Sequence, residues 1–350
     1  MDIAVVVNLK ARRGSEAVAR RVRHALPGAR VLASRSLGEA ADFARDLCAA
    51  PPELLLSAGG DGTVVALMNV LRETRGLDVI DSAPAGTLPV LLGPSALGVL
   101  PLGTGNGLAR ATGATRWQSA LRQLGRAAQG TQPLPSRRFD LVEVCGKVAH
   151  FAGTGWDAEI IDDFHAQKTG FGVLPKSARI GLAGYLQGLF MRTIPRHTMA
   201  RKRVEVELYN TGSDALTVDD RGRPVPLPGG ENGKLLYRGP ASVCAAATSA
   251  EWGFGFRAFP FAGLVPRRFC MRIYSAHALE ATMRMGRLWR GEHPMPKMHT
   301  WLLDQCRAVF SEPVPFQSGG DRIGHKSDVV YSLAQEQVDV LDWTRLYAAA

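Results

Sequence analysis

Cysteine is scarce in this chain, with five residues among 350. Their number is odd, and no two lie in a Cys-x-x-Cys or other zinc-ligand spacing, which argues against a disulfide scaffold or a zinc module. The N-terminus carries Asp2 where a signal peptide carries bases, and its apolar run Ile3–Val7 is too short for a signal sequence. We therefore expect a cytoplasmic protein. The cysteines are Cys48, Cys145, Cys244, Cys270 and Cys306.

Long apolar runs are also missing. The uncharged stretch 82–109 is interrupted by prolines that would break a membrane helix several times, so we expect loops around one buried strand there. Hydrophobic residues make up 46% and charged residues 21% of the chain, which are ordinary values for a globular protein. At about 150 residues per domain, the length predicts two domains.

Acidic residues are absent from segments 82–139 and 164–204, whereas arginines and lysines recur in both. The whole chain has a net charge of +10, which favours anionic partners such as nucleotides or lipid headgroups. The arginine-rich segments lack a recognised nucleic-acid-binding motif and interleaved aromatic residues, so we expect no nucleic acid partner.

The first 130 residues alternate apolar runs with helical patterns, which predicts a parallel sheet covered on both faces. The pattern then changes to period two, which predicts a mostly antiparallel second domain. A helix is expected over 182–192, and a hairpin or surface loop over 210–233. The expected domains are 1–138, 139–335 and a tail 336–350 that packs back on the first domain. In the first domain we expect strands at 3–7, 30–33, 54–56 and 97–102 and helices at 16–25, 37–49 and around 64–71; in the second, strands at 139–144, 148–152 and 204–209.

A glycine loop, Ser57–Thr63, joins the strand at 54–56 to the following helix. Glycines let a phosphate approach the backbone at a helix N-terminus, where unpaired amides and the helix dipole attract anions. Thr63 is expected to cap the helix. Asp61 has no expected role in the turn and would repel a phosphate unless a metal ion stands between them. This combination favours a phosphate site over a simple glycine-rich turn.

A second glycine loop, Gly103–Gly107, follows the strand at 97–102 and opens another helix. It lacks the Gly-x-Gly-x-x-Gly spacing of dinucleotide-binding loops, and the chain contains no Gly-x-x-x-x-Gly-Lys-Ser/Thr motif. Two such loops after neighbouring parallel strands would form one phosphate cradle.

These motifs resemble the catalytic domain of the diacylglycerol kinase-like lipid kinases, which include sphingosine and ceramide kinases. The resemblance rests on Gly59-Gly-Asp-Gly-Thr63, on Asn69 in the next helix and on Val99–Arg110, and it covers about residues 1–160. Asp140-Leu-Val and Gly153–Ala158 are similar to further family motifs. Later in the chain, Phe316–Asp321 occupies the place of the family's Asp-Gly-Glu.

The resemblance implies an α/β N-terminal domain of the NAD kinase and diacylglycerol kinase type, followed by a mostly antiparallel β domain. It implies ATP and Mg²⁺ as cofactors and transfer of the γ-phosphoryl group to a lipid hydroxyl, of diacylglycerol or sphingoid type, at an anionic membrane surface. Asp61 would act on the metal or the attacking hydroxyl, and Asp321 is the expected general base, with Asp157 as a further candidate on the substrate side. The implied nucleotide-binding residues are Asn8, Gly59, Gly60, Asp61, Gly62, Thr63, Gly103, Thr104, Gly105 and Asn106.

The chain also departs from the family's pattern. Gly107 stands where many bacterial members have aspartate, Gly319-Gly320-Asp321 replaces Asp-Gly-Glu, and Phe261–Val265 replaces an acidic segment that binds a structural metal in some members. A nucleotide- or lipid-binding relative with impaired catalysis is therefore the alternative. An NAD kinase is a weaker one, because that family's Asn-Glu pair and Thr-x-x-Gly-Ser-Thr segment are missing. The segment Met283–Arg290 mixes arginines with apolar residues, as an interfacial element or an ordinary amphipathic surface would.

Overall fold

The computed structural model describes residues 1–77, 88–130, 132–156, 158–159 and 203–348. The chain forms two compact units, Met1–Phe139 with Gln335–Ala350, and Asp140–Ala334. The helix expected over 182–192 lies outside the described residues.

The first unit is built on a parallel sheet with strand order β16-β4-β3-β1-β2. These strands are β1 (Ile3–Asn8), β2 (Arg30–Ser34), β3 (Leu54–Gly59), β4 (Ala96–Pro101) and the end of β16 (Asp321–Leu341), which pairs with β4 through Val340 and Leu97. The interior strands are mostly apolar, and every residue of β3 is buried, as expected for a sheet covered on both faces.

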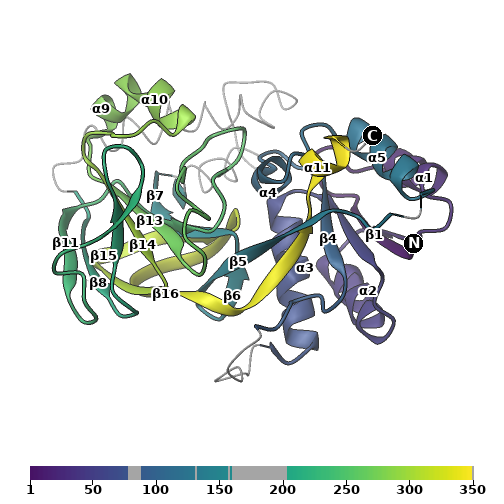
Figure 1. Cartoon of the computed structure of the whole chain (residues 1–350), viewed down its shortest axis with the longest axis horizontal. Coiled ribbons are helices and arrows are strands. Elements are labelled where there is room, and N and C mark those ends of the chain that lie inside the picture. The colour runs from purple at the N-terminus through teal and green to yellow at the C-terminus, as the bar shows by residue number, and fades with distance from the viewer. Residues whose placement is uncertain (78–87, 131, 157, 160–202, 349–350) are drawn as a thin grey trace. The chain divides into compact units, whose positions relative to one another are not determined.

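Helices cover both faces of this sheet. Helix α1 packs against α5 and α5 against α11, while α2 packs against α3 (Figure 1). Right-handed crossovers explain why the helices are divided between the two faces. The chain moves across the sheet in one direction from β1 to β2, and in the opposite direction from β2 through β3 to β4. The helices are α1 (Glu16–Ala25), α2 (Leu37–Ala49), α3 (Asp61–Thr74), α4 (Gly107–Ala111), α5 (Trp117–Ala127) and α11 (Trp343–Ala348).

The C-terminal segment of the chain is part of the first unit. Arg72 of α3 and Glu336 of β16 form an ion pair of 2.6 Å, with side chains only 5% and 0% exposed. Trp343 is fully buried, and Gln123 of α5 donates from Nε2 to the carbonyl oxygen of Leu346 at 3.2 Å. These contacts fix the last residues beside α3 and α5.

The second unit is an antiparallel β structure whose main sheet follows the order β10-β9-β14-β13-β12-β7-β15-β16. One apolar core includes Phe269, Phe316 and Tyr331, all essentially inaccessible. The remaining elements are β5 (Ser136–Val144), β6 (Lys147–Ala149), β7 (Phe151–Gly155), β8 (Glu205–Asn210), β9 (Leu216–Val218), β10 (Pro224–Pro226), β11 (Leu235–Pro240), β12 (Val243–Ala247), β13 (Phe269–Tyr274), α9 (Ala278–Met283), α10 (Met285–Arg290), β14 (Met298–Leu303) and β15 (Gln305–Ser318).

The structure confirms the fold class and refines its details. The hairpin expected within 210–233 is present, since β9 and β10 pair in antiparallel register. A single strand over 148–152 was wrong: β6 ends at Ala149 and β7 begins at Phe151, because β6 pairs with β5 whereas β7 pairs with β12 and β15.

Candidate functional site

The two glycine loops lie at the carboxyl ends of adjacent strands. In the strand order β4-β3-β1-β2 the chain reverses its direction of travel between β1 and β3, and ligands of open α/β sheets bind at such a switch point. Asn8 ends β1, Gly59 ends β3 and Pro101 ends the neighbouring β4. The sheet topology therefore brings the sequence-predicted residues of the first unit together.

The first loop leads directly into α3, which begins at Asp61 with Gly60 as its N-cap residue. Thr63 is therefore in the first turn, and its expected role as the cap was wrong. Its Oγ1 instead accepts a hydrogen bond of 2.8 Å from Nδ2 of Asn8. Gly60 offers no side-chain cap, and its carbonyl accepts from the amide of Thr63 at 3.0 Å. The Asn8–Thr63 bond joins β1 to α3 across the switch point.

The two loops touch through their backbones. The amides of Leu102 and Gly103 donate to the carbonyl oxygen of Gly59 at 2.9 and 3.0 Å. A Cβ atom on Gly103 would lie 2.3 Å from Cα of Gly60, which no side chain could accommodate without a backbone shift. Glycine is thus required here by close approach, and the contact holds the two loops together through backbone rather than side chains.

Asn106 closes the second loop. It adopts the left-handed conformation (φ 56°, ψ 46°), which asparagine tolerates better than most residues. Its Oδ1 accepts from the amide of Gly103 at 2.9 Å, and its Nδ2 donates to the carbonyl of Gly103 at 3.0 Å. Between these two residues, Thr104 and Gly105 are half-buried, as is Gly62 in the first turn of α3.

Asp61 connects the first loop to the helix after the second. Its Oδ2 accepts from the amide of Gly107 at 3.0 Å and its Oδ1 from the amide of Leu108 at 3.1 Å, the first two residues of α4. A carboxylate at a helix N-terminus is favoured by the unpaired amides and the dipole. Asp61 thus holds α4 against the start of α3, a structural role that the sequence did not predict.

The loop after β1 completes the site and was missed from the sequence. The amide of Arg13 donates to the carbonyl of Leu102 at 3.0 Å, and a Cβ on Gly14 would lie 2.0 Å from the carbonyl oxygen of Asn8. The backbone amide of Lys10 donates to Oδ1 of Asn8 at 2.9 Å, which orients the amide of Asn8 toward Thr63. The available signal was a lone glycine six residues after the strand's last residue, too common a feature to be recognised alone.

The described acidic side chains do not form a metal-binding cluster. Within the described ranges, no group of three or more His, Cys, Asp and Glu side chains is arranged to hold a metal ion. Asp157 lies outside the described residues.

Asp321 belongs to the second unit, where it is exposed and opens β16. It pairs with Ser318 across a two-residue turn made by Gly319 (φ 58°) and Gly320 (φ 88°). Positive φ at both positions is the requirement of a tight hairpin turn, which explains the paired glycines in physical terms. Gln317, which is fully buried, accepts from the amide of Gly320 at 3.0 Å.

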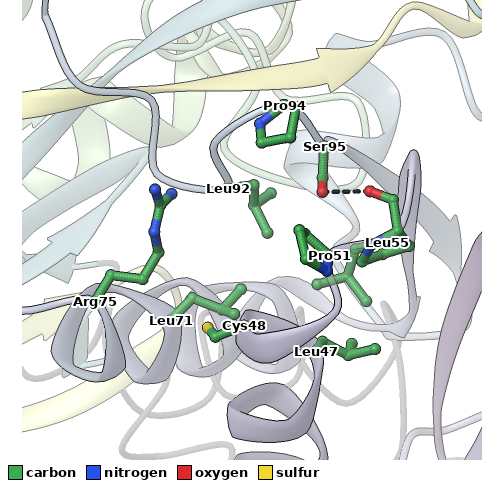
Figure 2. A pocket seen from close by; sticks show the side chains of 10 residues that line it. Leu47, Cys48, Pro51, Leu55, Leu71, Arg75, Leu92, Pro94 and Ser95 are labelled. Atoms are coloured by element: carbon green, nitrogen blue, oxygen red, sulfur yellow. Dashed lines mark hydrogen bonds between the residues drawn. The ribbon is translucent and has the colours of Figure 1, made fainter.

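A cavity of about 70 Å³ lies at the other end of the strands, near the starts of β3 and β4. Figure 2 shows its apolar walls, with the Arg75 guanidinium and the Cys48 thiol among them. Burial raises the pKa of the Cys48 thiol, with Arg75 opposing that change, so the thiol is less reactive than a free one. The cavity is separate from the glycine loops, and its small volume suits packing better than a substrate.

The amphipathic segment 283–290 is divided between two short helices. Leu279 and Met283 on α9 are 60% and 75% exposed. The neighbouring bases are tied to acids: Glu280 pairs with Arg284 and Lys297, and Glu292 with Arg287 and Arg290. Of the helices that the structure describes, none has both the length and the apolar character needed to cross a bilayer.

Comparison with known proteins finds a family match in the first unit. Residues 2–137 match the model of the diacylglycerol kinase catalytic domain family. A diacylglycerol kinase from Bacillus anthracis is 14% identical with a TM-score of 0.58, and the match covers 96% of both chains. A second structure from that organism, described as a candidate diacylglycerol kinase, has a TM-score of 0.62 at 14% identity, covering 96% of this chain and 94% of the other. No curated protein matches the sequence.

Proposed function

We propose that this protein is an ATP-dependent lipid kinase, because residues 2–137 match the model of the diacylglycerol kinase catalytic domain family. It transfers the γ-phosphoryl group of ATP to a hydroxyl of a diacylglycerol or sphingoid lipid, at the cytoplasmic surface of an anionic membrane. The observation that carries the proposal is the backbone contact between two glycine loops at the switch point of the sheet. In this proposal, residues 1–138 bind the nucleotide and residues 139–335 bind the lipid.

ATP binds, in this proposal, along the edge formed by the two loops. The N-terminus of α3, a helix of 14 residues, directs its dipole toward that edge and favours phosphate. Because the half-buried Gly60 and Gly62 carry no side chains, the phosphates can approach the backbone there, while the buried Gly59 and Gly103 hold the two loops together. Asn8 and Thr63, which are joined by a hydrogen bond, form one side of the nucleotide site. The loop Gly103–Asn106, with Thr104 and Gly105, forms the opposite side.

Asp61 would be the protein ligand for Mg²⁺. Magnesium ions are commonly held by one or two carboxylates, with phosphates and water as the other ligands, so a single carboxylate fits the group. The metal would neutralise charge on the transferring phosphoryl group. Asp61 also accepts hydrogen bonds from the amides of Gly107 and Leu108, one at each oxygen, so its carboxylate is held in place at the start of α4.

The acceptor hydroxyl requires a base or a positioning acid. Asp321, exposed at the hairpin turn, is the proposed base, and Asp157 is the further candidate on the substrate side. Phosphoryl transfer depends mainly on positioning and charge neutralisation, so a single carboxylate near the hydroxyl suffices for this step.

A specific observation favours a second candidate, a nucleotide-binding relative with impaired catalysis. The carboxylate of Asp61 already serves as a cap for α4, and glycines occupy positions 107 and 319. A protein in which Asp61 acts only as a structural cap would bind ATP through the glycine loops without transferring phosphate.

The test is phosphoryl transfer from γ-labelled ATP, with Mg²⁺, to a panel of diacylglycerols, sphingosines and ceramides in mixed micelles, beside calorimetric titration with a nonhydrolysable ATP analogue. Labelled lipid that depends on Mg²⁺ supports the kinase. ATP binding without any labelled lipid supports the impaired relative. Absence of both would refute the nucleotide site itself.

A further inference from the structure

Helices α1 and α5 lie side by side on one face of the first unit's sheet (Figure 1). They approach closely at Gly125, where a Cβ atom would lie 2.9 Å from the carbonyl oxygen of Ala25. The guanidinium of Arg21 on α1 lies 5.9 Å from the ring centre of Trp117 on α5, in a cation–π arrangement. The two helices therefore form one continuous rigid surface.

The outward sides of these helices carry a concentration of positive charge. Six exposed arginines form what we call the α1–α5 arginine face: Arg20, Arg21, Arg23, Arg116, Arg122 and Arg126.

Acids are nearly absent from the segments that build this face. Segment 103–139 contains none, and segment 9–34 contains only Glu16, which pairs with Arg35 at 2.8 Å. In the part of the chain that the structure describes, none of the six guanidinium groups forms an ion pair. The face thus holds at least six positive charges without local neutralisation, and their repulsion favours association with a surface of opposite charge.

We propose that the α1–α5 arginine face docks the protein on an anionic phospholipid bilayer. This inference rests on the proposed function, because a kinase for membrane lipids must reach its acceptor at the bilayer. Arginine suits the role because its planar guanidinium binds phosphate oxygens in a bidentate manner. Two adjacent helices present several such groups at once to a plane of lipid headgroups.

Nucleic acid fits this face less well. Single-stranded nucleic acids stack their bases on exposed aromatic rings, and the one Phe, Tyr or Trp residue in α1 and α5 is Trp117, which is 6% exposed. The α9–α10 segment is the competing bilayer contact. Its four cations share Glu280 and Glu292, so half of their charge is neutralised locally.

The test is cosedimentation of the full chain with vesicles of phosphatidylcholine alone and of phosphatidylcholine containing about 30 mol% phosphatidylglycerol, at low and moderate salt. We expect strong, salt-sensitive binding to the anionic vesicles only. The variant Arg20→Glu/Arg23→Glu/Arg122→Glu/Arg126→Glu should reduce that binding by about 100-fold or more, since each base near an anionic surface contributes substantially.

A matched control has the same net charge as the arginine variant. The variant Lys147→Glu/Arg221→Glu/Lys234→Glu/Arg257→Glu reverses four exposed bases of the second unit, and it should retain at least most of the binding. Equal loss in both variants would overturn the proposal, because net charge alone would then govern adsorption. The proposal would also be overturned if the arginine variant kept its vesicle binding while the variant Leu279→Ser/Met283→Ser lost it. The neutral set Arg20→Gln/Arg23→Gln/Arg122→Gln/Arg126→Gln, checked by circular dichroism, replaces the glutamate set if that set does not fold.

Two further measurements separate this inference from its alternatives. Tighter binding of the wild-type chain to a mixed-sequence RNA than to anionic vesicles, abolished by the same arginine changes, would overturn it in favour of a nucleic acid. Phosphorylation of a short-chain acceptor dispersed in neutral detergent should be unchanged in the arginine variant, since the face is not part of the phosphate cradle. Charge-dependent vesicle binding without transfer to any lipid would uphold the docking face and refute the kinase.

Discussion

The Nδ2 amide of Asn8 and the Oγ1 hydroxyl of Thr63 are joined by a hydrogen bond of 2.8 Å, although 55 residues separate them in sequence. It links the last residue of β1 to the first turn of α3, at the point where the chain reverses the direction in which it adds strands to the sheet. The bond fixes the relation between the loop after β1 and the first glycine loop, on which the proposed nucleotide site depends.

Thr63→Val removes the acceptor of that bond while keeping the shape of the side chain. We expect the free energy of unfolding to fall by about 1 kcal/mol, the net value of an ordinary hydrogen bond. Affinity for an ATP analogue should also fall, measured by calorimetry beside urea denaturation. Thr63→Ser retains the hydroxyl and is the control. If valine and serine give the same affinity, the hydroxyl has no part in the site.

Gly60→Asp tests the phosphate cradle. A Cβ at this position would lie 3.1 Å from Cα of Gly103, and the added carboxylate would repel phosphate at the N-terminus of α3. We expect ATP affinity to fall by at least about tenfold, or 1.4 kcal/mol, in calorimetric titration. Gly28→Asp adds the same charge where nothing lies within 4 Å of the new Cβ, and it should bind ATP normally. Unchanged affinity in Gly60→Asp would remove the loop from the nucleotide site.

The sequence predicted helix bounds correctly where residues next to the helix determine them. Helices over 16–25 and 37–49 have the expected bounds, because the hydroxyls of Ser15 and Ser36 accept amide hydrogen bonds that start them. It did less well for side-chain contacts between segments that are far apart in the sequence. The role of Asp61 follows from the adjacency of β3 and β4, which places α4 beside the start of α3. No pattern within the Gly-Gly-Asp-Gly-Thr motif encodes a bond to residues more than 40 positions away.

The buried ion pair between Arg72 and Glu336 predicts that removing one partner destabilises the protein more than replacing both. Glu336→Gln should lower the free energy of unfolding by about 3 kcal/mol or more, because the buried Arg72 would lose the carboxylate that it pairs with at 2.6 Å. The double variant Arg72→Met/Glu336→Leu should lie within about 1 kcal/mol of the wild type or be more stable. Guanidinium unfolding of both variants measures this. A larger loss in the double variant than in the single one would show that the pair itself holds the C-terminal segment in place.

Asp321 is the proposed general base, so changing it tests an active kinase against an impaired relative. If it acts as general base, Asp321→Asn should lower turnover by about 100-fold to 10,000-fold and leave ATP affinity unchanged, since the nucleotide loops belong to the other unit. Asp328→Asn is the control: it changes an acid of the same strand, β16, that pairs with Arg307, and it should leave turnover unchanged. If Asp321→Asn keeps full activity while Asp61→Asn loses it, the base is Asp61 or water.

Restoring the missing acids addresses the case in which the wild-type chain binds ATP but phosphorylates no lipid. Gly319 has a φ of 58°, a conformation that aspartate tolerates, so Gly319→Asp should leave the hairpin folded. Gly107 is the first residue of α4, where an added carboxylate is favoured by the helix dipole but lies near the carboxylate of Asp61. We therefore expect Gly319→Asp to be the more stable single variant by thermal unfolding, and the pair with Gly107→Asp to be needed for any gain in transfer. A gain would identify a kinase that has lost its acids, whereas no gain in a folded double variant that binds ATP would leave an untested acceptor as the better explanation.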